Sequence, residues 1–174
     1  LSDPAMEEAF FDMPLYRGFA RLDEVGRVPD ESTILRFRHR LEKNKLADAI
    51  LQEVNELLSQ RGLMLKVGTI VDATLIAAPS STKNKDKERD PEMHSSKKGE
   101  QMYFGMKAHI GADADSGLVH TVRGTSGNVH DVVEGNSLLH GQEQVGFGDA
   151  GYQGVDKRAD ANPNVSWHIA MRPG

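Results

Sequence analysis

The fold is decided by the stretch from residue 65 to residue 76, which reads Leu65-Lys66-Val67-Gly68-Thr69-Ile70-Val71-Asp72-Ala73-Thr74-Leu75-Ile76. It is rich in β-branched residues and a Pro-Ser-Ser turn follows it, so it predicts a buried strand. One acid, Asp72, interrupts this apolar run. A second acid, Asp149, ends the run Gln144-Val145-Gly146-Phe147-Gly148, which predicts another strand.

Acids in apolar strands point to a cation site. A buried carboxylate is unfavourable unless it is paired or binds a cation. If the two strands are neighbours, Asp72 and Asp149 repel each other, and a hard divalent ion with oxygen ligands removes the repulsion. Two Mg²⁺ ions about 3.5–4 Å apart would serve phosphoryl displacement. The alternative is that Asp149 caps a turn and Asp72 lies exposed at a strand end. On pattern alone, this alternative is favoured.

The first sixty residues predict helices. Asp30 and the acidic residue after it provide a cap and a first turn for a helix over residues 31–43. Gly62 suits the left-handed cap of a second helix, whose apolar residues recur at helical spacing: Leu46, Ile50, Val54, Leu57 and Leu58. A short helix is expected around residues 5–11. We therefore expect a small helical domain over residues 1–62 and a domain of mixed strands and helices over residues 63–174.

The rest of the chain predicts an α/β domain. Residues 102–112 and 118–123 predict two strands of a hairpin, joined by a turn rich in Asp and Gly. Residues 80–101 mix lysines with acids and predict a long mobile loop. Asp131 is placed to cap a short helix. Residues 165–170 predict a last short strand.

The composition of the chain excludes several kinds of functional site. The chain has 174 residues and no cysteine, which excludes disulfides, thiolate zinc sites and a cysteine nucleophile. Its formal net charge of -5 argues mildly against a free-standing nucleic-acid binder, which is usually basic. No apolar run approaches the roughly 18 residues that span a bilayer. We expect a cytoplasmic protein.

Four histidines recur at nearly even spacing: His109, His120, His130 and His140. A metal site needs converging ligands rather than a period, so the spacing alone predicts structural or solvated histidines. His130 is the exception because it lies in one of the motifs below.

Four motifs follow one another along the chain: Val71-Asp72-Ala73-Thr74-Leu75-Ile76, Tyr103-Phe104-Gly105-Met106-Lys107-Ala108-His109, Asn128-Val129-His130-Asp131 and Gly148-Asp149-Ala150-Gly151-Tyr152. In this order they resemble the Asp-Asp-Glu transposases of bacterial insertion sequences, specifically the fifth insertion-sequence family. The segment from Pro29 to Arg38 resembles the N-terminal helical domain of that family. The resemblance therefore covers essentially the whole chain.

The resemblance implies a ribonuclease H-like mixed sheet behind a small helical domain. It makes Asp72 the first catalytic acid and Asp149 the second, and both would hold Mg²⁺ or Mn²⁺. It implies a third acid, a Glu on a helix, which has no counterpart before Gly174. We accordingly expect a fragment truncated before that Glu, with an incomplete two-ion site and no activity alone. The intact enzyme would cut element ends and join the 3′-hydroxyl to target DNA.

The expected partners are DNA, both element ends and target, and a second copy of the chain. No membrane or small-molecule substrate is expected. The DNA-binding candidates are the basic residues of the helical domain and two residues near the acids: Arg36, Arg38, Arg40, Lys107 and His130. One alternative is a catalytically dead remnant that only binds DNA or a transposase. A metal-dependent nuclease without strand transfer is another.

Overall fold

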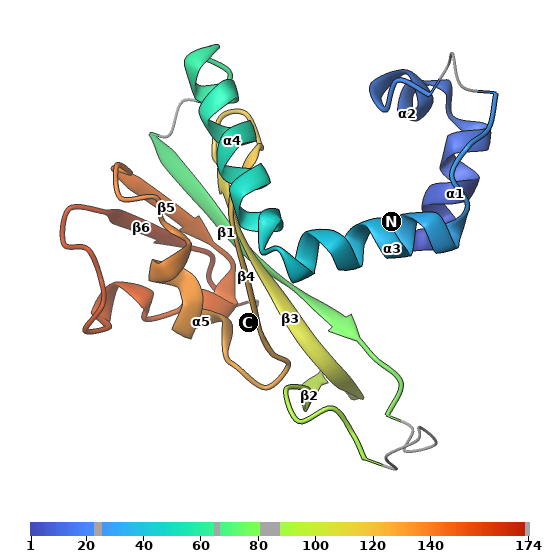
Figure 1. Ribbon diagram of the computed structural model, residues 1–174. Helices are drawn as coiled ribbons and strands as arrows, with labels where there is room; N and C mark the ends of the chain where they lie inside the picture. The colour runs from blue at the N-terminus through green and yellow to red at the C-terminus, as the bar shows by residue number, and fades with distance from the viewer. Residues whose placement is uncertain (23–25, 65–66, 81–87, 173–174) are drawn as a thin grey trace. The chain divides into compact units, whose positions relative to one another are not determined.

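The structure is a computed structural model that describes residues 1–22, 26–64, 67–80 and 88–172. The chain forms two compact units, Leu1–Glu53 and Val54–Gly174 (Figure 1). We describe each unit by itself. Among the helices in the described ranges, none has the length and apolar character needed to cross a membrane.

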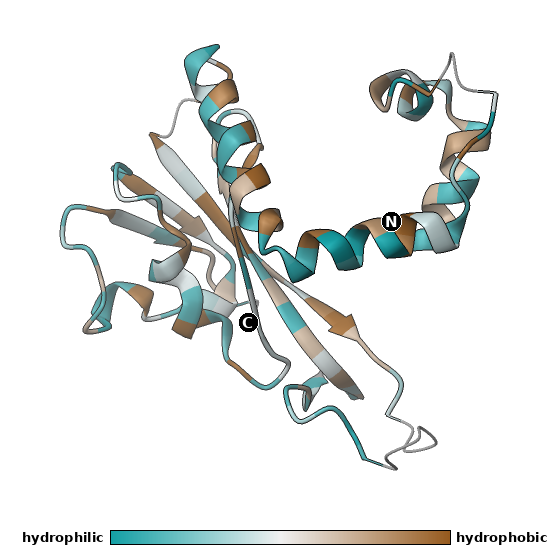
Figure 2. Cartoon of the chain, in the orientation of Figure 1, coloured by the Kyte–Doolittle hydropathy of each residue, from teal (hydrophilic) through white to brown (hydrophobic). Residues whose placement is uncertain are grey.

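The first unit is helical. It contains α1 (Asp3–Asp12), α2 (Pro14–Phe19), α3 (Glu31–Lys43) and the beginning of α4 (Leu46–Gln60). The helices predicted over residues 5–11 and 31–43 and from Leu46 are confirmed. Figure 2 shows hydrophilic and hydrophobic residues alternating along α3 and α4, the pattern from which they were predicted.

The ends of these helices follow from local hydrogen bonds. Asp30 Oδ1 accepts a hydrogen bond of 2.7 Å from the backbone N–H of Thr33, so the predicted cap of α3 is confirmed. Gly62 follows α4 with φ of 68°, a left-handed conformation that glycine adopts without strain. Arg38 Nη1 lies 3.1 Å from Asp3 Oδ1, which ties α3 to α1.

The second unit is built on a six-stranded mixed sheet with the order β2-β3-β1-β5-β6 and with β4 also paired to β3. The strands are β1 (Gly68–Ala77), β2 (His94–Lys98), β3 (Gln101–Asp113), β4 (Val119–Ser126), β5 (Val145–Gly148) and β6 (Ser166–Ile169). β1 runs antiparallel to β3 and parallel to β5, and β5 runs parallel to β6. The predicted α/β class, the hairpin of β3 and β4 and the last strand are confirmed.

Two predictions about loops need correction. Residues 80–101 are not one long loop, because β2 pairs with the first residues of β3; residues 81–87 of the predicted loop lie outside the described residues. Asp131 does not cap α5 (Asp131–Glu134) with its side chain, because the N-cap residue is His130, without a side-chain cap bond. The carboxylate of Asp131 is held instead by Lys107.

The core lies on one face of the sheet and is covered by short helical segments. These are α5, η1 (Gly135–Leu138), η2 (Ala150–Tyr152) and η3 (Val155–Lys157). They bring together Val71, Leu138, Tyr152 and Val155, with Val132, Trp167 and Ile169 packed against them. Alternation along β1 buries Thr69 and Val71 and leaves Ile70 and Asp72 exposed.

Candidate active site

The two predicted acids lie on neighbouring strands. β1 and β5 pair in parallel with Ile70 opposite Phe147. Asp72 and Asp149 each follow two residues later, so they occupy corresponding positions where β5 ends. The condition on which the cation hypothesis depended, that the two strands are neighbours, is therefore met.

The alternative that the pattern favours, with accessible acids, agrees with the structure, except that Asp72 lies within β1 and not at its end. Asp72 and Asp149 are both exposed. Asp72 is exposed because it alternates with Val71, which points into the core on the other face of β1. Asp149 caps η2, since its Oδ1 accepts a hydrogen bond of 2.8 Å from the N–H of Gly151. The structure thus contains the turn-capping role that the pattern allowed.

A third carboxylate, Asp131, lies close to Asp149. A Cβ built on Gly151 would be 2.9 Å from Asp149 Oδ1 and 3.3 Å from Asp131 Oδ2, so both carboxylates border this glycine. Lys107 Nζ contacts the other oxygen, Asp131 Oδ1, at 2.8 Å, and donates to the carbonyl of Val129 at 2.7 Å. The ammonium of Lys107 therefore compensates the charge of Asp131.

Tyr152 lies under these acids in the core. Burial raises the pKa of the Tyr152 phenol, and the carboxylates of Asp131, Asp72 and Asp149 raise it further, in that order. All three carboxylates are therefore close enough to Tyr152 to affect its ionisation. Among the described residues its hydroxyl has no hydrogen-bond partner.

The predicted DNA-binding residues fall into two groups. Lys107 and His130 lie in the second unit beside Asp131, with Lys107 half-buried and His130 exposed at the start of α5. Arg36, Arg38 and Arg40 lie exposed on α3 in the first unit. Their spacing places Arg36 and Arg40 on one face of the helix, whereas Arg38 turns away from them.

Arg38 differs from the other two arginines in its contacts as well. Its Nη1 is paired with Asp3, which reduces the positive charge that it presents. Arg36 Nη2 is 3.5 Å from the hydroxyl of Ser32, an uncharged partner.

Sequence reasoning missed a different cluster. Among the described residues, one group of three metal-binding side chains has its ligand atoms within 4.8 Å of one another, and it is His120, His140 and Glu143 rather than the acids. The prediction of structural or solvated histidines did not include this proximity of His120 and His140. His109 is buried and isolated from them, with its Nε2 2.8 Å from the hydroxyl of Thr125. Burial lowers the pKa of His109.

Comparison with known proteins was made for the whole chain. A family model described as a transposase DDE domain matches residues 64–173, which is more than half of the chain. A second model, described as a transposase domain (DUF772), matches residues 1–40. No solved structure matches the chain.

Proposed function

Because the chain belongs to the DDE transposase family, we propose that Asp72 and Asp149 are two of the acids that hold the divalent metal for DNA strand transfer. Domains of this family are ribonuclease H-like, and they indicate a DNA transposase that depends on divalent metal. The observation that carries the proposal is the parallel register of β1 and β5, which gives the two acids corresponding positions.

The donor chemistry fits Mg²⁺ or Mn²⁺. Both ions prefer carboxylate oxygens, keep several waters and bind through one or two carboxylates. Asp72 and Asp149 are exposed, so a hydrated ion can approach them. When bound, the ion would neutralise charge on the phosphate and activate the attacking oxygen.

The neighbouring residues set the charge of this site. The carboxylates of Asp131 and Asp149 border the same glycine and would repel each other, and Lys107 reduces that repulsion by pairing with Asp131. Asp131 thereby supplies a fixed negative group beside Asp149. We place His130 and Lys107 next to bound DNA, where their N–H groups would contact phosphate oxygens.

The helical unit supplies a second DNA contact in this proposal. Arg36 and Arg40 share one exposed face of α3 and would neutralise phosphates of an element end. Such contacts position DNA without reading its sequence. In this proposal the transposase cuts the element end and joins the freed 3′-hydroxyl to target DNA. Self-association of the chain is part of this proposal, because joining two element ends requires two active sites.

Manganese binding tests the assignment of the acids. Mn²⁺ is titrated into the chain and free Mn²⁺ is followed by electron paramagnetic resonance. Weak binding is expected, and Asp72→Asn and Asp149→Asn should each lower the affinity by at least the roughly tenfold that loss of an outer-sphere partner costs. Asp115→Asn is the matched control, since Asp115 is exposed on the turn between β3 and β4.

Two outcomes would contradict the assignment. Equal Mn²⁺ affinity in Asp72→Asn, Asp149→Asn and the parent chain would remove these residues from the metal site. DNA binding that persists in a chain with no Mn²⁺ affinity would favour the alternative, a module that binds DNA without catalysis.

A further inference from the structure

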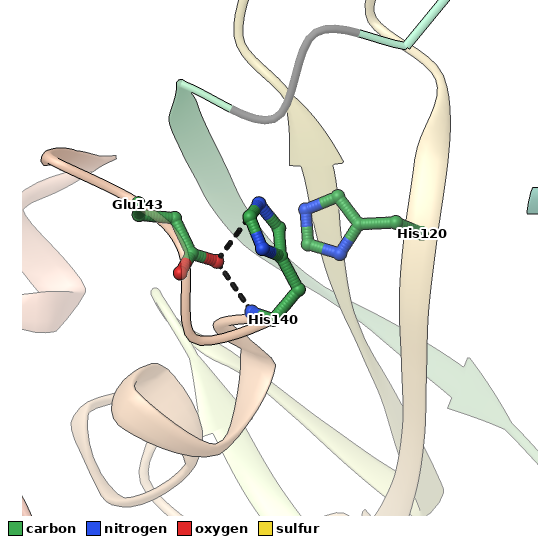
Figure 3. A group of neighbouring side chains, drawn as sticks. All are labelled: His120, His140 and Glu143. Atoms are coloured by element: carbon green, nitrogen blue, oxygen red, sulfur yellow. Dashed lines mark hydrogen bonds and ion pairs between the residues drawn. The ribbon is translucent and has the colours of Figure 1, made fainter. Parts of the chain in front are cut away.

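We propose that His120, His140 and Glu143 form a zinc site that is separate from the acids. His120 lies on β4, and the other two residues lie in the segment between η1 and β5. One ligand atom from each residue lies within 4.8 Å of the others. Figure 3 shows the His120 ring facing the His140 ring, with the Glu143 carboxylate pointing toward His140.

The site is enclosed. His120 is 8 % exposed and Glu143 is 4 % exposed, and the side chain of His140 is 12 % exposed. The Glu143 carboxylate accepts hydrogen bonds from the backbone N–H groups of His140 and Gly141 and from the hydroxyl of Thr69. A buried, ionised carboxylate beside two imidazoles is a set of donors that favours a cation.

The hydrogen bonds around Glu143 Oε1 indicate where a cation would bind. Thr69 Oγ1 donates to Glu143 Oε1 at 3.0 Å, so the ring of His120, whose Nε2 is 3.0 Å from the same hydroxyl, donates to it. His140 Nε2 lies 3.3 Å from Glu143 Oε1. The hydroxyl of Thr69 and the backbone N–H of His140 thus donate to one carboxylate oxygen, beside which His140 Nε2 also lies. A divalent ion would replace the protons on Nε2 of the two imidazoles.

Two imidazoles and one carboxylate suit zinc better than magnesium. Zn–N bonds of about 2.0–2.1 Å place the ligands of a tetrahedral site about 3.3 Å apart. The separation of 3.3 Å between His140 Nε2 and Glu143 Oε1 already matches this value. The most distant ligand pair, at no more than 4.8 Å, needs to close by up to about 1.5 Å.

The ring environments specify what zinc binding would change. His120 Nδ1 lies 2.9 Å from the hydroxyl of Thr121, which can accept a hydrogen bond from Nδ1–H once Nε2 binds metal. His140 Nδ1 accepts a hydrogen bond of 3.2 Å from the backbone N–H of Gln142. Binding through His140 Nε2 would move the remaining ring proton to Nδ1 and end this bond. Zinc binding therefore has a spectroscopic signature in the imidazole nitrogens.

The site would act as a clamp on the sheet. It would join β4 to the segment that leads into β5, and Thr69 links it to β1. β5 is a strand of four residues with Asp149 directly after it. Holding the residues that precede such a short strand in place would restrict the movement of Asp149, the residue that follows it. The clamp is structural, and it stands whether or not Asp72 and Asp149 hold a metal.

Calorimetry of the full 174-residue chain with Zn²⁺, in excess Mg²⁺, tests the proposal. We expect one zinc ion per chain. His140→Gln and Glu143→Gln should each lower the affinity by more than the roughly 100-fold upper cost of losing an outer-sphere partner. His39→Gln is the matched control, because His39 is exposed on α3 in the other unit. The Asp72→Asn chain should keep its zinc, which separates this site from the acids.

Folding is checked apart from binding. Circular dichroism in the presence of a chelator shows whether each variant is folded without zinc. Added zinc should then raise the melting temperature of the parent chain but not that of His140→Gln. The ¹⁵N spectrum of the parent should show the His140 proton moving from Nε2 to Nδ1. The proposal is overturned if the parent chain binds no stoichiometric zinc, or if folded His140→Gln and Glu143→Gln bind it as tightly as the parent. Either result would leave a cluster held by hydrogen bonds alone.

Discussion

The ammonium of Lys107 on β3 lies 2.8 Å from the carboxylate of Asp131 at the start of α5, and both side chains are partly removed from solvent. Removing the cation alone would leave a partly buried carboxylate without a partner. We therefore expect Lys107→Met to lower the free energy of unfolding by about 1–3 kcal/mol. Urea denaturation followed by circular dichroism measures the change.

Asp131→Asn and the double variant complete the thermodynamic cycle. If the pair stabilises the fold as a unit, the double variant should lose less stability than the sum of the single variants. Strict additivity would show that Lys107 and Asp131 are not energetically coupled.

The same pair predicts an effect on metal affinity. In Lys107→Met, Asp131 stays negative beside Asp149 and loses its compensating cation, so Mn²⁺ should bind more tightly than in the parent chain. In Asp131→Asn, Lys107 keeps its positive charge and Mn²⁺ should bind more weakly. The Mn²⁺ titration described above measures both. An unchanged affinity in both variants would place the metal away from this end of the sheet.

DNA affinity should depend more on Arg36 and Arg40 than on Arg38, the third of these arginines on α3. Arg36 and Arg40 share a face, so replacing both with Gln should reduce the slope of log affinity against log salt by about two. Arg38→Gln should change the slope less, because Arg38 is paired with Asp3. Fluorescence anisotropy with labelled duplex DNA at several salt concentrations gives the slopes. A larger effect from Arg38→Gln would place the DNA on the other face of α3.

Local patterns predicted most of the fold. β1 was found from its β-branched residues, the hairpin of β3 and β4 from its Asp- and Gly-rich turn, and α3 from the Asp30 cap. In each case the determinant lies within a few residues of the element. These are the features that a single sequence carries best.

What the sequence did not reveal depends on distant partners. β2 consists of His94-Ser95-Ser96-Lys97-Lys98, which has no apolar residue, and it forms a strand through backbone pairing with β3. His120 and Glu143 come together because separate segments of the chain meet beside Thr69. No local spacing encodes such a meeting.

In the candidate site, too, local sequence predicted some features and others depended on distant parts of the chain. The strands that carry or precede Asp72 and Asp149 followed from two apolar runs, whereas the pairing of these strands came from the tertiary structure. Their exposure agreed with the alternative that the pattern favoured, but its cause, which face of β1 the short helical segments cover, required the structure. The contact of Asp131 with Lys107 likewise required the tertiary structure.

Tyr152 offers a test of the core beneath the acids. Its hydroxyl is buried, has no hydrogen-bond partner among the described residues, and lies near three carboxylates. Tyr152→Phe should therefore change the free energy of unfolding by less than about 1 kcal/mol. Tyr152→Ala should cost about 3–5 kcal/mol, because it leaves a cavity in the core. A large loss in Tyr152→Phe would show that the hydroxyl makes a stabilising contact.

Gly146 tests how tightly β5 is packed. A Cβ at this position would lie 2.6 Å from Cε3 of Trp167 and 2.8 Å from its Cζ3, closer than side-chain atoms approach. The indole or the strand must shift, so Gly146→Ala should lower the free energy of unfolding by about 1–3 kcal/mol. Gly124→Ala on β4 is the control, because no atom lies within 4 Å of the added Cβ. There, the lower entropy of the unfolded chain should leave stability unchanged or slightly raised.

A second substitution identifies Trp167 as the cause. If the clash is with the indole, Trp167→Leu should lower stability in the parent chain, but adding Gly146→Ala to that variant should cost much less than Gly146→Ala alone. Urea denaturation of the four chains measures this coupling. Equal costs in the two backgrounds would show that Gly146 is required for backbone conformation rather than for the approach of Trp167. In that case β5 would be held by its pairing with β1 and β6 and not by this contact.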